Sequence, residues 1–202
     1  MRFYDRHILP HLLNLAMRNS DLQPYRRRVV SRARGRVLEI GIGSGLNLSY
    51  YTPEATGILG LDSHPKFVVM ASRKTSSVPV RIIGGSAELV PVASASMDTV
   101  VSTWTLCSIP DVAAALREIR RVLKADGQLL FVEHGLAPEQ GTRRWQHRLT
   151  PLWKKIAGGC HLDRPIDQLV QNAGFEIMQM QTGYMPGPNL MTFMYEGSAR
   201  PI

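Results

Sequence analysis

The sequence has 202 residues, of which 44% are hydrophobic, so it is long and apolar enough for one domain with a full core. No stretch approaches the roughly 20 consecutive apolar residues of a membrane span, and the first seven residues lack the apolar region of a secretory signal. The two cysteines, Cys107 and Cys160, are too few for a disulfide framework. We therefore expect a cytoplasmic protein.

The net charge of +8 is concentrated near the N-terminus. Residues 1–36 hold nine arginines against Asp5 and Asp21, whereas the rest of the chain is nearly balanced. Such a segment is a solvated helical face, a contact for an anionic membrane surface or a site for nucleic acid. We favour the first and keep the second open. A non-catalytic RNA-binding protein is a weaker alternative, because only Tyr25 lies among the arginines and no RNA-binding motif occurs.

The N-terminal segment is predicted to contain two helices, at 7–18 and 24–34. Pro10 is compatible with the first helix only in its first turn. We therefore divide the chain into a basic helical extension at 1–35, which acts as a lid or a surface contact, and a main domain at 36–202.

The main domain alternates strands with helices. Apolar and β-branched runs predict strands at 36–41, 57–62, 80–84, 98–104, 127–134, 175–183 and 189–196. Helices are predicted near 45–51, 65–76, 112–124, 143–157 and 165–173. This alternation is typical of an α/β fold with parallel strands and right-handed crossovers. Only a short Pro- and Gly-rich turn joins the last two strands, which favours an antiparallel hairpin at the edge of the sheet.

A glycine-rich turn follows the first predicted strand. Gly41, Gly43 and Gly45 allow the backbone to bend sharply and to approach a ligand closely. A dinucleotide site requires a third glycine where this chain has Leu46, which disfavours an NAD-dependent oxidoreductase. Asp62 ends the next strand and is placed to accept hydrogen bonds from ribose hydroxyls, or else to cap a helix. The pattern indicates a nucleoside site.

These segments resemble the class I S-adenosylmethionine-dependent methyltransferases over most of residues 36–183. Val37 to Gly45 resembles their first motif, Leu61-Asp62 their ribose-binding acid, and Gly84 to Glu88 the loop beside the adenine. The resemblance implies a Rossmann-like, doubly wound seven-stranded sheet with the seventh strand antiparallel, and S-adenosyl-L-methionine as cofactor. It also implies a set of cofactor-binding residues: Glu39, Gly41, Ile42, Gly43, Asn47, Asp62, Ser63, Ser86, Ala87 and Trp104. Many relatives have an acid where this chain has Ser86.

Three further segments resemble a narrower group, the alkyl-thiol methyltransferases and their bacterial relatives. They are Thr105 to Pro110, Phe131 to His134, and Gly159 to Leu162. The resemblance implies a small apolar acceptor, with a thiol as the first choice. A phospholipid amine or a quinone-type lipid is the alternative acceptor.

Glu133 and His134 are the candidate catalytic residues, because they close the fifth predicted strand at the end where α/β sheets bind ligands. Strand alternation sends them in opposite directions, so we expect one of them to face the site. His134 titrates near neutrality and is the better base, unless it only bonds a loop carbonyl. Cys107 and Cys160 are interpreted as small packing residues, and no metal site is expected.

The predicted helix 143–157 carries an apolar stripe and a basic face. Trp145, Leu149, Trp153 and Ile156 recur at helical spacing, and five Lys and Arg side chains occupy the other side. The stripe is typical of a core-facing helix. A basic helix with tryptophans is also typical of contact with lipid headgroups.

Overall fold

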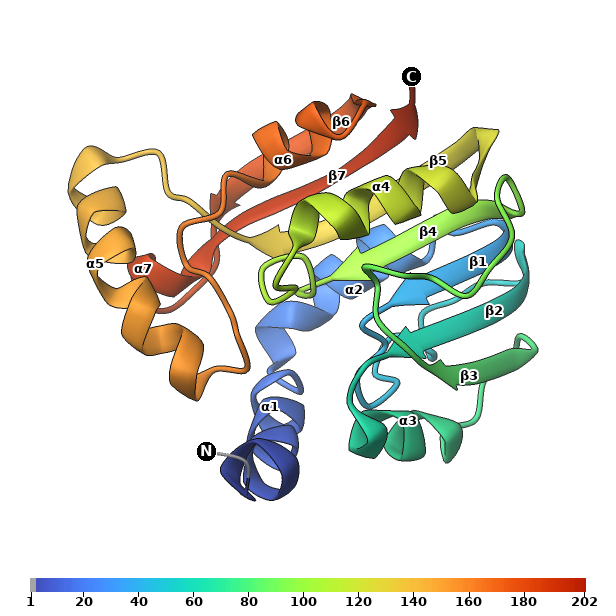
Figure 1. Cartoon of the computed structure of the whole chain (residues 1–202), viewed down its shortest axis with the longest axis horizontal. Coiled ribbons are helices and arrows are strands. Elements are labelled where there is room, and N and C mark those ends of the chain that lie inside the picture. Colours follow the sequence, from blue (N-terminus) through green and yellow to red (C-terminus); the bar gives the residue numbers. More distant parts are fainter. Residues whose placement is uncertain (1–2) are drawn as a thin grey trace.

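The computed structural model describes residues 3–202 and is built on one seven-stranded sheet (Figure 1). Its strand order is β3-β2-β1-β4-β5-β7-β6. The strands are β1 (Gly35–Ile40), β2 (Ala55–Asp62), β3 (Val80–Gly84), β4 (Met97–Thr103), β5 (Leu123–His134), β6 (Phe175–Tyr184) and β7 (Phe193–Pro201). Strands β1 to β5 pair in parallel, and β7 runs antiparallel to both β5 and β6. The predicted fold class is confirmed.

Helices cover both faces of this sheet. They are η1 (Tyr4–Ile8), α1 (Leu9–Ala16), η2 (Ser20–Leu22), α2 (Gln23–Val30), α3 (Pro65–Ser72), α4 (Val112–Val122), α5 (Gln140–Ile156), α6 (Ile166–Asn172) and α7 (Asn189–Thr192). In Figure 1, α4 and α6 lie in front of the sheet and α2 lies behind it. Among residues 3–202, no helix is both long and apolar enough to cross a bilayer.

The central strands are buried on both sides because neighbouring residues point into two separate cores. Leu38 and Val100 pack in one core with the inner faces of α4 and α6. Val37 and Val101 pack in the other with Val29 and Val30 of α2, and with Ala71 of α3. Continuous apolar runs such as Leu129–Val132 are therefore read correctly as central parallel strands.

Two local predictions are wrong. Residues 45–51 form successive turns rather than a helix, with bonds from Gly45 N to Ile42 O and from Tyr50 N to Asn47 O. Gly41, Gly43 and Gly45 have positive φ, and the side chain of Asn47 turns inward to bond Glu39, which keeps the segment out of regular helix.

The second error concerns the last strand, which begins at Phe193 and not at 189. Residues 189–192 form the short helix α7, where Thr192 Oγ1 donates to Pro188 O at 3.1 Å. Pro188 cannot donate to a strand ladder and instead precedes the helical turn. The antiparallel hairpin between β6 and β7 nevertheless forms, with Tyr184 opposite Phe193.

Candidate functional site

One cavity of about 430 Å³ lies at the carboxyl ends of the parallel strands. Turns that follow β1, β2, β3 and β4 contribute to its wall, together with His134 at the end of β5. Ten of the predicted site residues line it: Gly41, Ile42, Gly43, Asn47, Asp62, Ser63, Ser86, Ala87, Trp104 and His134. Glu39 and Glu133 lie behind the wall and do not line it. This is the location expected for the ligand of an open α/β sheet.

Asp62 is anchored at the end of β2 by two backbone groups. Gly43 N donates to its Oδ2 at 2.9 Å and His64 N donates to its Oδ1 at 2.8 Å. Each oxygen of an ionised carboxylate has a second acceptor position, so two hydroxyl groups can still bind. Burial raises the pKa of Asp62, while these backbone bonds oppose that shift.

The glycine turn brings bare backbone to the cavity wall. Gly41 and Gly43 have φ of +63° and +57°, a region that favours glycine. A side chain at Gly41 would collide with Thr105, whereas at Gly43 the nearest atom is 3.9 Å from a built Cβ. The backbone of Gly43 therefore faces open space beside the Asp62 carboxylate.

Behind this turn, Glu39 organises a buried polar network. Its Oε1 accepts from Asn47 Nδ2 at 2.8 Å and its Oε2 accepts from Tyr51 OH at 2.7 Å. Arg26 Nε donates to Asn47 Oδ1 at 3.0 Å and reaches the network from α2. Burial raises the pKa of Glu39 to about 7, although the bonds from Tyr51 and Asn47 oppose that shift. Glu39 thus holds Asn47 in place.

Trp104 continues the wall directly after β4 in an unusual conformation. Its φ of +50° is rare for a residue other than glycine and is typical of a constrained site. Its backbone N–H donates to Val132 O at 2.8 Å, and the Arg26 guanidinium lies 4.8 Å from the centroid of the indole ring. The N-terminal segment therefore supports the indole from behind.

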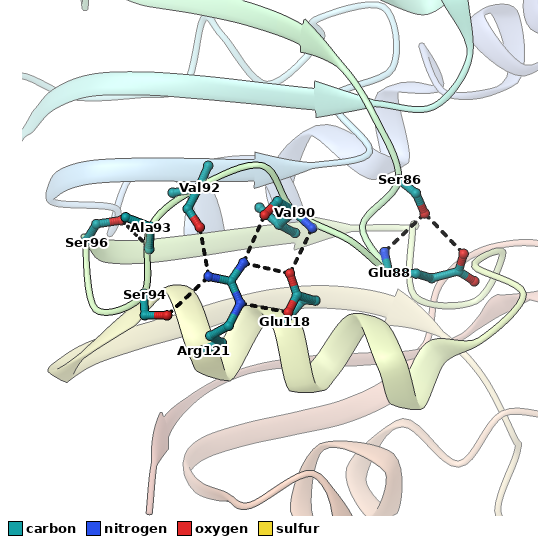
Figure 2. A network of polar contacts seen from close by, with 9 residues as sticks. All are labelled: Ser86, Glu88, Val90, Val92, Ala93, Ser94, Ser96, Glu118 and Arg121. Carbon is teal, nitrogen blue, oxygen red and sulfur yellow. Dashed lines mark hydrogen bonds and ion pairs between the residues drawn. The ribbon is translucent and has the colours of Figure 1, made fainter.

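Ser86 and Ala87 line the cavity after β3, in a loop that is tied to α4 (Figure 2). The Ser86 hydroxyl donates to Glu88 Oε2 at 3.1 Å, so a carboxylate lies beside the serine although it does not line the cavity. Arg121 bonds Val90 O, Val92 O and the Glu118 carboxylate, which fixes the rest of the loop.

Glu133 is fully buried and supports the loop between β4 and α4. Its Oε1 accepts from Ser102 Oγ at 2.8 Å and from the backbone N–H groups of Thr105 and Leu106, both at 3.0 Å. Its Oε2 accepts from Cys107 N at 3.3 Å. Burial and the nearby Cys107 sulfur raise its pKa to about 8. The carboxylate is occupied by the protein itself, so of the two candidate catalytic residues only His134 faces the cavity.

His134 lies against both cysteines of the chain. Its Nε2 is 2.8 Å from Cys160 Sγ, and its buried Nδ1 has no hydrogen-bond partner among residues 3–202. Ligand atoms of Cys107, His134 and Cys160 all lie within 4.8 Å of one another. A hydrogen bond from Cys160, opposed by burial and reinforced by His134, lowers the pKa of Cys107 well below its usual value. Both cysteines line the cavity, in contrast to the packing role expected from sequence.

The N-terminal helices close one side of the cavity. Leu9, Leu13 and Asn14 of α1 line it, and Tyr4 OH donates to Ile156 O of α5 at 3.0 Å. Figure 1 shows α1 below the sheet, between α5 and α3. The two sides of α1 differ in exposure, because Leu9 and Leu13 line the cavity whereas the side chains of Leu12 and Leu15 are 49% and 70% exposed.

Sequence reasoning missed several residues that shape the cavity. Arg26 belongs to the arginine-rich segment that the sequence predicts to be solvated, yet it is only 4% exposed. Arg164 is also buried and donates to the carbonyls of Leu106 and Ile109, which fixes the loop of Cys107. Both belong to segments far in sequence from the strands they support, so no local pattern could have identified them.

Comparisons with known proteins agree with this geometry. A family model described as "Methyltransferase domain" matches residues 38–131. Thiol S-methyltransferase TMT1B of Rattus norvegicus is 34% identical over 77% of this chain and 68% of its own length. The Homo sapiens protein of that name is 31% identical over 86% and 79%. A solved S-adenosylmethionine-dependent methyltransferase from Mesorhizobium loti superposes with a TM-score of 0.68 at 17% identity, over 90% of this chain and 98% of its own.

Proposed function

Because this chain belongs to the class I S-adenosylmethionine-dependent methyltransferases, we propose that it transfers the methyl group to the sulfur of a small, apolar thiol. The methyl donor of this family is S-adenosyl-L-methionine. The observation that carries the proposal is the likeness to two proteins named thiol S-methyltransferase over most of their length.

We assign the nucleoside end of the cavity to Asp62 and its neighbours. Asp62 holds the ribose hydroxyls, with Ser63 beside it, and Ser86 and Ala87 border the adenine. The backbone of Gly41 to Gly43, which is open at Gly43, and the indole of Trp104 face the methionine part of the cofactor. Glu39 contributes indirectly, because it positions Asn47. Residues 1–35 act as a lid over the domain at 36–202, which is supported by the four α1 residues in the cavity wall, Leu9, Pro10, Leu13 and Asn14.

We assign the other end of the cavity, near His134, to the acceptor. Methyl transfer is a direct displacement, so the protein chiefly aligns the two reactants and excludes water. S-Adenosylmethionine supplies an electrophilic methyl group when bound. A thiol is the acceptor that needs least help, because a few per cent is already thiolate at pH 7. His134 is the catalytic residue closest to the acceptor in this assignment, and Glu133 is a positioning residue.

We also propose that an apolar surface beside the cavity contacts anionic lipid headgroups. This lid-edge surface consists of Ile8, Leu12 and Leu15 from the N-terminal helices and Leu152 and Ile156 of α5, all of them exposed. Lys154 and Lys155 lie on α5 beside it. Apolar side chains flanked by basic ones are typical of peripheral membrane contacts, and an apolar acceptor could enter from the lipid. A cytoplasmic location is supported by two free cysteines.

An acceptor panel tests the function. The purified protein is incubated with isotope-labelled methyl donor and with alkyl thiols, aryl thiols, amines, phenols, quinols and phosphatidylethanolamine. We expect labelled thioethers only. Labelled amine, lipid or quinol products with unmodified thiols would show that the chain serves the alternative lipid acceptor. Asp62→Ala is the matched negative control, because it removes the carboxylate assigned to the ribose hydroxyls and leaves the methyl-acceptor end of the cavity intact.

A further inference from the structure

Three side chains at the acceptor end form a cluster that methyl transfer alone does not require. Cys107, His134 and Cys160, the Cys2His cluster, place their ligand atoms within 4.8 Å of one another in the cavity wall. We propose that the Cys2His cluster binds a zinc ion whose fourth position takes the sulfur of the acceptor thiol. The identity of the fourth ligand rests on the proposed function, in which a thiol accepts the methyl group. The metal itself rests on the Cys2His cluster alone.

The backbone around the cluster is fixed on every side. Cys107 N donates to Glu133, and Cys107 O accepts from His161 N at 2.8 Å. His134 is the last residue of β5 and pairs with Met194 of β7. A zinc site requires ligands held in place by the fold, and two of these three are held by the sheet and its adjoining loop.

The third ligand is brought in by a turn that only glycine permits. Gly158 and Gly159 precede Cys160 and have φ of +62° and +85°. A Cβ at Gly159 would lie 3.0 Å from Ser108 O, closer than nearly all real Cβ contacts. The missing side chain therefore lets the Cys160 loop pack directly against the Cys107 loop, and this contact assembles the cluster.

The spacing of the ligand atoms suits a tetrahedral zinc ion. Zn–S bonds of ~2.3 Å and Zn–N bonds of ~2.0 Å put neighbouring ligand atoms ~3.5–3.8 Å apart. His134 Nε2 and Cys160 Sγ are 2.8 Å apart, and all the ligand atoms lie within 4.8 Å of one another, so the range required by zinc falls between these two values. Rotation of the Cys160 and Cys107 side chains is the adjustment that the proposal requires.

The chemistry of the donors also suits this ion. Thiolate and imidazole are the ligands that zinc prefers, and two thiolates cancel its charge, so the loaded cluster is neutral when buried. Trp153 Nε1 donates to Cys160 Sγ at 3.3 Å, and Ser108 Oγ lies 3.5 Å from Cys107 Sγ. Such bonds orient metal-bound thiolates. The ring nitrogen of His134 that faces the cluster is Nε2, 2.8 Å from Cys160 Sγ, so Nε2 is the ligand atom in this proposal and the buried Nδ1 lies outside the coordination sphere.

Three protein ligands leave one position open, as catalytic zinc sites do. A thiol that binds there releases its proton to water, because the ion stabilises the thiolate. The sulfur then forms a bond to the methyl carbon as the methyl–sulfonium bond breaks, and that electron pair stays on the donor sulfur. The neutral thioether is a weaker ligand and leaves. His134 ligates the metal in this scheme and takes no proton.

This arrangement would make the acceptor end selective for sulfur. A soft thiolate competes well for zinc, whereas an amine or alcohol of equal size is protonated or weakly bound at neutral pH. Selectivity therefore comes from the metal rather than from the shape of the cavity.

The first test is a cobalt(II) titration of the full chain, reduced and stripped of metal. We expect one ion per chain, with the intense visible bands and the sulfur-to-metal charge transfer of a tetrahedral, thiolate-ligated ion, and displacement by zinc. Weak octahedral bands, binding of more than one ion without saturation, or a Cys107–Cys160 disulfide that persists under reduction would overturn the proposal.

Variants locate the ion. Cys107→Ser, Cys160→Ser and His134→Asn should each weaken zinc binding tenfold or more, by roughly the loss expected for disturbing a metal site. His147→Asn is the matched control, because His147 lies on the exposed face of α5 and bonds only Asp163 among the described residues. Unchanged affinity in all three cluster variants would contradict the assignment. Binding of S-adenosylhomocysteine checks that each variant is folded. If a variant does not fold, the cobalt(II) titration of the wild type decides whether the cluster binds a metal.

Addition of ethanethiol to the cobalt-loaded chain tests the fourth position. We expect stronger charge-transfer absorption from a third sulfur ligand, and no change with ethanol. The metal-free enzyme should lose at least nine-tenths of its thiol methylation and recover it with zinc. Full activity without metal would overturn this inference and leave the proposed function standing. A loaded metal site in an enzyme that methylates only amines or quinols would overturn the proposed function and leave the metal site standing.

Discussion

The two ends of the cavity are built differently. The nucleoside end comes from three successive turns, at Gly41 to Asn47, at Asp62 to His64 and at Gly85 to Ala87, and it relies on backbone N–H groups and one carboxylate. The acceptor end joins Cys107 and Cys160, from two loops, with His134, at the end of β5, and the three are far apart in sequence. The first end is therefore specified by local chain geometry and the second by tertiary packing alone.

The largest expected effect concerns the support of the acceptor end. Glu133→Ala removes the acceptor for Ser102 and for three backbone N–H groups, which are left buried and unpaired. We expect a loss of ~3–5 kcal/mol in the free energy of unfolding, measured by urea denaturation. Glu133→Gln keeps one oxygen for Thr105 and Leu106 and should lose clearly less. A loss below ~1 kcal/mol in the alanine variant would show that the loop needs no carboxylate.

The next effect concerns Glu39, the buried acid behind the nucleoside end of the cavity. Burial holds the pKa of Glu39 at about 7, above its ordinary value of 4.5. A raised carboxyl pKa contributes stability that is fully present below pH 4.5 and is lost as pH rises through 7. The contribution is at most ~3 kcal/mol.

Glu39→Gln should remove this dependence. The free energy of unfolding of the wild type, measured by urea denaturation from pH 5 to 8, should fall more steeply with pH than that of the variant. The variant therefore gains relative to the wild type as pH rises. Parallel curves would mean that Glu39 is ionised throughout, and that its bonds to Asn47 and Tyr51 outweigh burial.

Asp62→Ala tests the nucleoside end itself. Loss of charge-assisted hydrogen bonds worth ~1.5–3 kcal/mol should weaken S-adenosylhomocysteine by about tenfold to 150-fold in calorimetry. The KM for the thiol should barely change. Asp98→Ala is the control, because Asp98 lies at the other end of β4 and bonds Arg36 and Lys124 outside the cavity. Equal affinities in both variants would remove the ribose assignment.

The smallest effects separate the two sides of α1. Replacing Leu9 and Leu13, which line the cavity, with alanine should weaken S-adenosylhomocysteine several-fold and leave vesicle binding unchanged. Replacing the exposed Leu12 and Leu15 with alanine should do the reverse in sedimentation with phosphatidylglycerol vesicles. If neither pair changes cofactor affinity, the N-terminal helices are no lid. If neither changes sedimentation, the lid-edge surface binds no lipid.

The same contrast explains how far sequence reasoning could go. The glycine turn and Asp62 were identifiable because left-handed backbone requires glycine and because strand ends meet at one edge. The segment after Gly45 was mispredicted as a helix, since the inward bond from Asn47 to Glu39 has no sequence signature. The Cys2His cluster was missed for a related reason. Its three members are spaced without a metal-binding motif and meet only through the close loop contact at Gly159.

The most direct test of the whole account is a crystal structure of the chain with S-adenosylhomocysteine. We predict that both ribose hydroxyls hydrogen-bond the Asp62 carboxylate and that the sulfur points along the cavity toward His134. The thiol sulfur and the methyl carbon would then meet at ~3–3.5 Å in the reactive complex. A nucleoside bound away from Asp62, or a sulfur directed away from the Cys2His cluster, would contradict the division of the cavity into these two ends.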